Sequence, residues 1–202
     1  MLRSWQQIAG FALILIAFGC THEKSSLGEE YFNKGEYARA IEEYTEVIKI
    51  KPRAIEVIYN RGRAYQELGQ EAEALTDFEK VLKLNPDHVQ ARLTIGNIDF
   101  KNGDYENAYY QFNKVVRKFN QNSNAFMFRG KANFRLGNVN EALADYGDAI
   151  RLNPQNGQAY LYRGIIYVQT KRKKSGCADF VKAQSLKVAD AETALRKYCG
   201  KK

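Results

Sequence analysis

The 202-residue sequence is poor in the residue types on which many catalytic and metal sites depend. It contains 2 His, 3 Cys, 2 Met and 1 Trp. Three cysteines are too few for a zinc site or an iron–sulfur cluster held by four cysteines. The sequence also lacks Gly-x-Ser-x-Gly, Gly-x-Gly-x-x-Gly and P-loop strings, which mark common catalytic and nucleotide-binding sites. These absences predict a protein that is not an enzyme and has no cofactor, metal or small-molecule substrate.

Long apolar runs are missing as well. The run over residues 8–18 is about half as long as the roughly 20 residues that a membrane-spanning helix needs. This length is typical of the apolar region of a secretory signal peptide, which we place at residues 1–19. Ala17 and Gly19 are the small residues that cleavage before Cys20 requires. We therefore expect an exported protein.

An apolar stretch that ends in Gly-Cys resembles the signal of bacterial lipoproteins, whose cysteine is lipidated and becomes the first residue. The resemblance implies a lipid anchor on Cys20, with more than one acyl chain for stable attachment to a membrane. The sequence departs from that family at Ala17, where a larger aliphatic residue is usual, and at Phe18, where a small one is usual. Cleavage without lipidation is the alternative and would leave a soluble exported protein. We expect a protein of the cell envelope, and the lipid anchor would hold it on a bacterial membrane, facing the periplasm or the exterior.

The rest of the sequence is built on a period of 34 residues. Five glycines share this spacing: Gly28, Gly62, Gly96, Gly130 and Gly164. Five small residues share it: Ala40, Ala74, Ala108, Ala142 and Gly176. Five aromatic residues share it: Tyr44, Phe78, Phe112, Tyr146 and Phe180. A second glycine series has a lysine in its fifth place: Gly35, Gly69, Gly103, Gly137 and Lys171. The three prolines also lie in one register: Pro52, Pro86 and Pro154.

Each 34-residue unit has the pattern of a helical hairpin. In the second unit we expect helices over 55–68 and 71–84, joined by a glycine turn. Gly62 and Ala74 are expected to face each other, because small side chains let two helix backbones approach closely. Phe78 would fill the adjacent space. A glycine inside a helix costs about 1 kcal/mol relative to alanine, so five in one register indicate a packing requirement.

This pattern resembles the tetratricopeptide repeat. The resemblance implies an all-α fold, a right-handed superhelical solenoid of five helical hairpins. The units would be 21–54, 55–88, 89–122, 123–156 and 157–190, and a helix over 190–200 would cap the last one. The resemblance also implies a non-enzymatic scaffold for protein–protein interaction.

Three units share an arginine before the packing glycine and an aspartate before the aromatic residue. We predict an ion pair within each hairpin: Arg61 with Asp77, Arg129 with Asp145, and Arg163 with Asp179. The other two units lack this arginine and have no aspartate at the matching place. Shared ancestry of recently duplicated units is the alternative explanation.

Two cysteines lie near the C-terminal end. Cys177 begins the second helix of unit five, and Cys199 ends the expected cap. The turn between these helices centres near Val188, 11 residues from each cysteine, so antiparallel helices would bring the two sulfur atoms together. An exported protein is in a compartment that permits disulfides. We predict a Cys177–Cys199 bond, and two buried thiols are the alternative.

Positive charge is concentrated at the same end. The net charge is +8, but residues 163–202 hold 11 Lys and Arg against 3 Asp and Glu, whereas residues 20–162 hold 19 against 20. Export makes nucleic acid an unsuitable partner. An anionic lipid or polymer bound through this basic end is the alternative function, and a solubilising polar cap is the simplest explanation.

In the resembling family, ligands lie in a concave groove lined by the first helix of each repeat. Carried over by register, that groove would consist of Tyr59, Asn60, Arg63, Asn97, Phe100, Met127, Phe128, Lys131, Phe134, Arg135 and Tyr162. Aromatic residues and arginine are enriched at interaction hot spots. We therefore expect a peptide segment of another protein, with acidic character, as the partner. Packing between helices is the alternative role for some of these rings, Phe100 and Phe134 above all.

Overall fold

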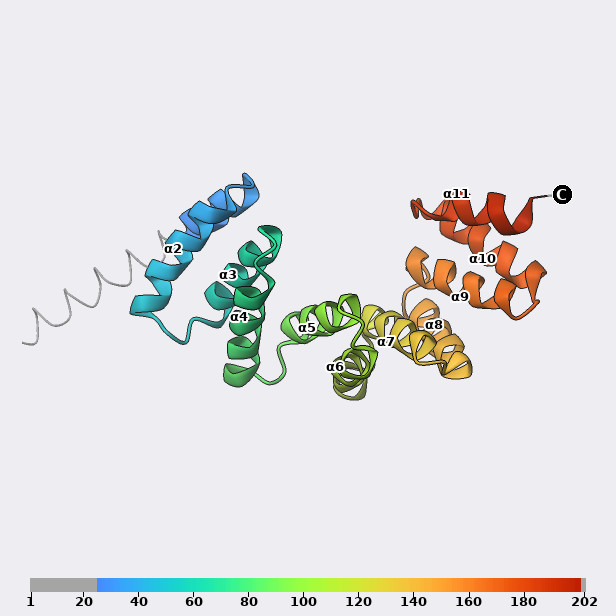
Figure 1. The fold of residues 1–202 in the computed structure, drawn as a ribbon, viewed down its shortest axis with the longest axis horizontal. Coiled ribbons are helices and arrows are strands. Elements are labelled where there is room, and N and C mark those ends of the chain that lie inside the picture. Colours follow the sequence, from blue (N-terminus) through green and yellow to red (C-terminus); the bar gives the residue numbers. More distant parts are fainter. Residues whose placement is uncertain (1–24, 201–202) are drawn as a thin grey trace, which may run out of the picture. The chain divides into compact units, whose positions relative to one another are not determined.

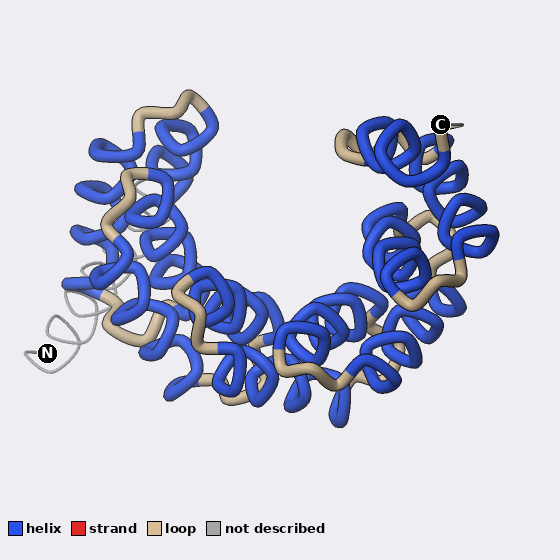
Figure 2. Tube along the Cα trace, turned by 45° about the vertical axis from the view of Figure 1, so that its right-hand side comes forward, coloured by secondary structure: helices blue, strands red, loops and turns tan. Residues whose placement is uncertain are grey.

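The computed structural model describes residues 25–200, which are helical apart from the connecting turns (Figure 2). Residues 25–33 are helical and precede α2. The helices that follow are α2 (Tyr37–Ile50), α3 (Ile55–Glu67), α4 (Glu71–Leu84), α5 (Val89–Lys101), α6 (Tyr105–Lys118), α7 (Ser123–Arg135), α8 (Val139–Leu152), α9 (Gly157–Gln169), α10 (Lys173–Ser185), α11 (Ala191–Ala194) and the π-helical η1 (Leu195–Cys199) (Figure 1). The prediction of an all-α fold is confirmed for these residues.

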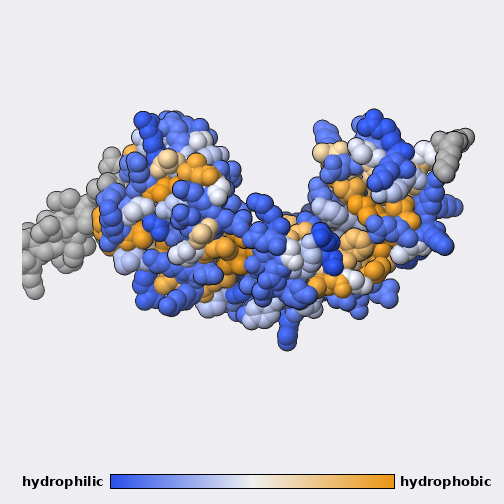
Figure 3. Space-filling view, viewed as in Figure 1, coloured by the Kyte–Doolittle hydropathy of each residue, from blue (hydrophilic) through white to orange (hydrophobic). Residues whose placement is uncertain are grey.

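The chain forms two compact units, Met1–Ala91 and Arg92–Lys202, which divide within the first turn of α5. In the N-terminal unit, α3 packs against both α2 and α4. In the C-terminal unit, contacts run from α6 to α7, α8, α9 and α10 in turn, and α10 also contacts α11 and η1. Consecutive helices therefore form hairpins that stack on their neighbours within each unit. The space-filling view shows hydrophobic residues between hydrophilic ones over α8 to α10 (Figure 3).

The repeated glycines make room for the repeated aromatic rings. A Cβ atom added at Gly62 would lie 2.8 Å from Phe78, and one at Gly130 would lie 2.9 Å from Tyr146. The same contact recurs between Gly28 and Tyr44, Gly96 and Phe112, and Gly164 and Phe180. All five rings are at most 1% exposed. The space left by each glycine is thus occupied by the ring of the second helix, a closer contact than the facing small pair expected from the sequence.

The turn inside each hairpin uses the left-handed backbone conformation. Gly35, Gly69, Gly103 and Gly137 have φ between 73° and 86°. Lys171 has φ 61° in the fifth turn, although this conformation is unfavourable for a residue with a Cβ atom. The last hairpin therefore keeps the shared turn geometry with a strained lysine in place of glycine.

The structure brings together the three predicted arginine–aspartate pairs. Arg61 donates to Asp77 through Nε and Nη2, at 2.8 and 2.7 Å. Arg163 donates to Asp179 through the same two nitrogens, at 2.8 and 2.9 Å. The third pair, Arg129 with Asp145, has its shortest contact at 2.6 Å. Each aspartate is buried, so each pair fixes the two helices of its hairpin.

A disulfide joins Cys177 of α10 to Cys199 of η1. Its two Cα atoms are 5.8 Å apart, and this prediction is confirmed. Beneath the bond, Leu161, Phe180 and Ala183 form a buried cluster with residues of α11. The short helices α11 and η1 therefore cover the outward side of the last hairpin.

The predicted signal peptide and Cys20 lie outside the described residues. Among the described helices, none combines the length and the apolar character that crossing a bilayer requires.

Candidate functional site

A pocket of about 340 Å³ lies in the C-terminal unit. Four helices supply its walls, with Phe100 from α5, two cations and a ring from α7, Tyr146 from α8 and two residues from α9. The lining residues are Phe100, Lys131, Phe134, Arg135, Tyr146, Tyr162 and Ile165. The pocket is therefore mostly apolar, with positive charge on one wall.

Helix α7 places both cations on the same side. Lys131 and Arg135 are four residues apart, so their side chains project from one face of the helix. Phe128 lies one turn before Lys131 on that face. The opposite side of α7 is buried through residues such as Ala125, Gly130 and Ala132. The packing of α7 thus fixes the direction in which its two cations point.

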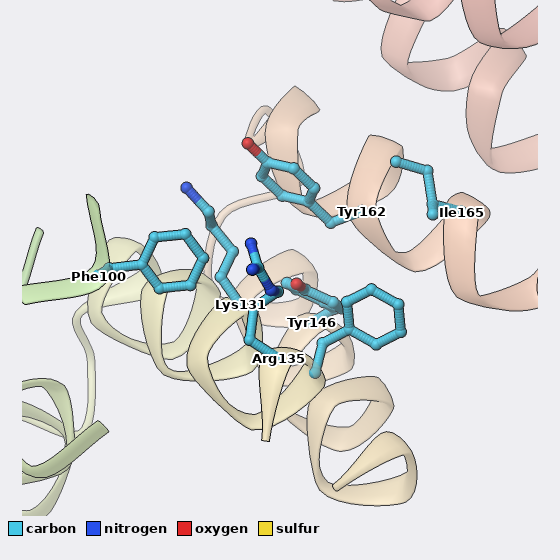
Figure 4. Close-up of a pocket in the computed structure, with 7 residues that line it drawn as sticks. Phe100, Lys131, Arg135, Tyr146, Tyr162 and Ile165 are labelled. Carbon is cyan, nitrogen blue, oxygen red and sulfur yellow. The ribbon is translucent and has the colours of Figure 1, made fainter. Parts of the chain in front are cut away.

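Aromatic rings surround Lys131. Its Nζ atom is 4.8 Å from the ring centroid of Phe100, 5.2 Å from that of Tyr162 and 5.8 Å from that of Phe128. Figure 4 shows the lysine side chain extending between Phe100 and Tyr162. A cation over the face of a ring is attracted by the negative potential there. These rings hold the ammonium group but supply no negative charge.

The second cation lies beside the first. The guanidinium carbon of Arg135 is 4.2 Å from the ring centroid of Tyr105 and 5.8 Å from that of Phe100. Arg135 is exposed, whereas Lys131 is half-buried. Neither cation forms an ion pair with a residue that the structure describes. The wall of the pocket therefore carries two positive charges without local compensation.

Burial shifts the pKa of three groups in the pocket. Removal from water lowers the pKa of the Lys131 ammonium below its ordinary value. Burial raises the pKa of Tyr162, and the charge of Asp190 adds to this effect. Burial also raises the pKa of Tyr146, so both phenols stay neutral. An anionic group that entered the pocket would reverse the effect on Lys131, because it would favour the charged form.

The structure brings together most of the predicted groove residues of the C-terminal unit. Phe100, Lys131, Phe134, Arg135 and Tyr162 line the pocket. Phe128 adjoins it and stacks on Phe112 with centroids 5.4 Å apart. Asn97 is half-buried on α5. The prediction for Met127 is wrong, because this side chain is only 6% exposed and belongs to the buried side of α7.

Three predicted groove residues belong to the N-terminal unit. The ring of Tyr59 lies against Phe78 and against His88, with centroids 5.5 and 4.9 Å away. The guanidinium of Arg63 lies 4.4 Å from the ring centroid of Phe32. Asn60 is half-buried on α3. Tyr59 therefore acts in packing within this unit, and Arg63 remains exposed above a ring.

Two features of the pocket do not follow from the repeat pattern. The pattern places Tyr146 in the core, and this residue also borders the pocket. The pattern gives no role to Tyr105, which stacks with Arg135. Phe100 has both of the roles expected for it, since it lines the pocket and packs against the core cluster of Ala108 and Phe112. The described residues contain no group of three His, Cys, Asp or Glu that could hold a metal ion.

Comparison with known structures identifies proteins of the same fold. MamA from Desulfovibrio magneticus RS-1 is 23% identical with a TM-score of 0.74, and the match covers 83% of this chain and 95% of that one. PilW, described as a widely conserved type IV pilus biogenesis factor, is 19% identical with a TM-score of 0.77, covering 89% and 84%. YrrB, described as a TPR protein with an unusual peptide-binding site, is 19% identical with a TM-score of 0.68, covering 86% and 89%.

Comparison of the sequence gives the family. No curated protein sequence matches the chain. The family model for the TPR repeat matches residues 28–69 and 130–171, and the model for the tetratricopeptide repeat matches residues 55–88. Together these matches span just over half of the 202 residues. The match at 55–88 coincides with the hairpin of α3 and α4, and each of the other two extends over parts of two hairpins. The chain belongs to the tetratricopeptide repeat family.

Proposed function

We propose that this protein is a non-enzymatic scaffold of a bacterial cell envelope, and that the pocket of its C-terminal unit binds an acidic segment of a partner protein. Scaffolding is the general role of tetratricopeptide repeats, and the fold shared with YrrB supports a peptide ligand. The observation that carries the proposal is the pair Lys131 and Arg135, two cations without ion-pair partners in a pocket of aromatic rings.

The chemistry of the pocket defines its ligand. A carboxylate would supply the negative charge that Lys131 and Arg135 lack, and charge-assisted hydrogen bonds to such a group are stronger than neutral ones. The rings of Phe100, Phe134 and Tyr162 would bury an apolar side chain. The volume of about 340 Å³ is at the lower end of ligand pockets and suits one large side chain. The proposed ligand segment therefore carries a large apolar residue next to an acidic one.

The proposed location rests on the two ends of the chain. Residues 1–19 have the pattern of a signal peptide, and Cys20 occupies the place of a lipidated cysteine. The Cys177–Cys199 disulfide agrees with an oxidising compartment outside the cytoplasm. A lipid on Cys20 would hold the scaffold at a membrane, where the pocket would recruit its partner.

Site-specific photocrosslinking in the native envelope tests the pocket. In one variant a photoreactive phenylalanine analogue replaces Phe134 in the pocket. In a control variant of the same chain the analogue replaces Tyr110, an exposed residue on α6. We expect a crosslinked partner from position 134 and none of the same mass from position 110. The crosslink should disappear when Lys131→Glu is added, because this change reverses the charge that attracts the partner.

A matched control separates the charge of Lys131 from the net charge of the chain. Lys114→Glu changes an exposed lysine beside Tyr110, so it alters net charge equally without touching the pocket. The crosslink should survive this change. A crosslink that persists in Lys131→Glu, or that is lost equally in Lys114→Glu, rules out recognition through the pocket.

A further inference from the structure

The exposed side of α10 is a second surface with an unusual composition. Figure 1 shows α10 between α9 and the C-terminal helices, and it contacts both α9 and α11. Its packed side consists of Gly176, Asp179, Phe180 and Ala183. The opposite side is exposed over residues 174, 178, 181, 182 and 185, which follow the helical repeat. This side carries lysines and an exposed valine, but no acidic residue.

The turn before α10 and the first residues of that helix extend the positive surface. Lys171, Arg172, Lys173 and Lys174 are all exposed. The four corresponding turns of the other hairpins contain no cation, since they read Gly-Glu-Tyr-Ala, Gly-Gln-Glu-Ala, Gly-Asp-Tyr-Glu and Gly-Asn-Val-Asn. The structure of the turn is the same in all five hairpins, so the fold does not require these cations. We define the basic face as Lys171, Arg172, Lys173, Lys174, Val181 and Lys182.

The lysines of the basic face do not serve the stability of the hairpin, whereas Arg172 stacks on Tyr167. Lys171 adopts a positive φ of 61°, which glycine adopts without strain. Lys173 and Lys174 lie in the first turn of α10, where the helix dipole favours acidic rather than basic residues. None of the four lysines of the face forms an ion pair with a described residue. The positive charge is therefore available to an external partner.

We propose that the basic face binds the surface of a lipid bilayer that contains anionic phospholipids. Four to eight clustered Lys and Arg residues suffice to attract a protein to such a surface. Val181 is 56% exposed beside Lys182, so it can enter the boundary between headgroups and acyl chains while the cations meet the phosphates. This binding is independent of the pocket and of Cys20.

The exposed valine distinguishes a membrane from a soluble polyanion. A polyanion in water offers phosphate or carboxylate charge but no apolar layer, so it would gain from the five cations and not from Val181. A bilayer with anionic phospholipids would bind both the cations and the valine side chain. The alternation of lysines with an exposed apolar residue on one helix side therefore favours lipid.

Vesicle binding tests the proposal with the full chain. The probes are vesicles of phosphatidylcholine alone and vesicles in which a third of the lipid is phosphatidylglycerol, and the measured quantity is the ratio of the two affinities. Any apolar contact that residues 1–24 make with lipid contributes equally to both kinds of vesicle, so it cancels in this ratio. We expect preference for the anionic vesicles, falling steeply with salt. A variant in which four lysines of the basic face are replaced should lose at least about 100-fold of that preference. Its substitutions are Lys171→Gly, Lys173→Gln, Lys174→Gln and Lys182→Gln.

A variant of equal net charge separates the face from the charge of the whole chain. It carries Arg53→Gln, Lys83→Gln, Lys114→Gln and Arg117→Gln, four exposed positions outside the basic face. Its preference should stay within about 3-fold of the native value, and circular dichroism should show that both variants keep their helices. Equal losses in the two variants, or no loss in the first, would overturn the proposal.

The valine provides the second test. Val181→Ser should weaken binding to anionic vesicles about 3-fold, through loss of apolar burial. The same change should leave binding to soluble polyphosphate unaltered. If Val181→Ser has no effect on vesicles while polyphosphate competes for the lysines, the ligand is a polyanion and the membrane proposal fails.

Discussion

The guanidinium of Arg129 and the carboxylate of Asp145 form a two-pronged hydrogen bond, in which Nε and Nη2 donate at 3.1 and 2.6 Å. The remaining Nη1 donates to Oδ1 of Asn113 on the preceding hairpin, at 2.7 Å. Arg61 repeats this arrangement in the N-terminal unit, where it joins Asp77 to Thr45. A single side chain therefore links the two helices of its own hairpin and the hairpin before it.

Arg129→Met should lower the free energy of unfolding by about 3 kcal/mol, because it leaves the buried carboxylate of Asp145 without its counter-charge. Arg151→Met is the matched control, since Arg151 pairs with Asp148 on the exposed side of α8. That change should cost less than about 1 kcal/mol. Urea unfolding followed by circular dichroism measures both. Equal losses would mean that the Arg129 pair is no stronger than a surface pair.

The packing glycines can be tested within one hairpin. Gly130→Ala places a Cβ atom 2.9 Å from the ring of Tyr146, so we expect a net loss of about 1 kcal/mol after the gain in helix propensity. Gly147→Ala is the control, because nothing lies within 4 Å of its added Cβ atom. It should raise stability by up to about 1 kcal/mol. Thermal unfolding of the two variants should thus shift in opposite directions.

The repeat architecture was predictable because it depends on short-range sequence periodicity. The expected helices of the second unit, 55–68 and 71–84, differ from α3 and α4 by a single residue. The disulfide was predictable because hairpin geometry relates two positions at equal distances from a turn. In both cases the determining contacts join helices that are close neighbours in the sequence.

The pocket was only partly predictable, because it depends on contacts among four helices. Register placed Met127 in the groove, but the rotation of α7 buries it. Register also could not show that Lys131 is held by rings from α5, α7 and α9 while Arg135 stacks on Tyr105. The links from arginine to the preceding hairpin were missed too, although a polar residue at both Thr45 and Asn113 was a usable signal.

Two substitutions at equivalent left-handed turns should change the free energy of unfolding in opposite directions. Lys171→Gly should stabilise the protein by about 1 kcal/mol, because it removes the strain of a Cβ atom at φ 61°. Gly137→Ala introduces that strain at φ 85° in the preceding hairpin and should destabilise by a similar amount. Chemical unfolding measures both changes. A destabilised Lys171→Gly would show that the lysine makes a compensating contact within the fold.

The disulfide should stabilise the cap in a redox-dependent way. Cys177 and Cys199 are 22 residues apart in sequence, and closing a loop of this length contributes about 3 kcal/mol. The double variant Cys177→Ser, Cys199→Ser should therefore unfold at a lower temperature than the native protein under oxidising conditions. With reductant present the two proteins should unfold at similar temperatures. A loss of the same size under both conditions would assign the effect to packing of the sulfur atoms.

Lys131 should oppose stability in the absence of its ligand. Burial lowers its pKa below the ordinary 10.5, so between the two pKa values the folded chain binds fewer protons than the unfolded chain. The free energy of unfolding contributed by this group is therefore lowest at neutral pH and rises as the pH rises through that window. Lys131→Met removes the charge and keeps the apolar contacts, so at pH 7 it should unfold at a higher temperature than the native protein.

The difference between Lys131→Met and the native protein should shrink as the pH approaches 10.5, because the native lysine then loses its proton as well. Lys114→Met, at an exposed position, should show no such pH-dependent gain. Thermal unfolding at pH 7, 9 and 10.5 compares the three proteins. If Lys131→Met is less stable at pH 7, the rings of Phe100, Tyr162 and Phe128 compensate the buried ammonium fully, and an acidic ligand is not needed to balance its charge.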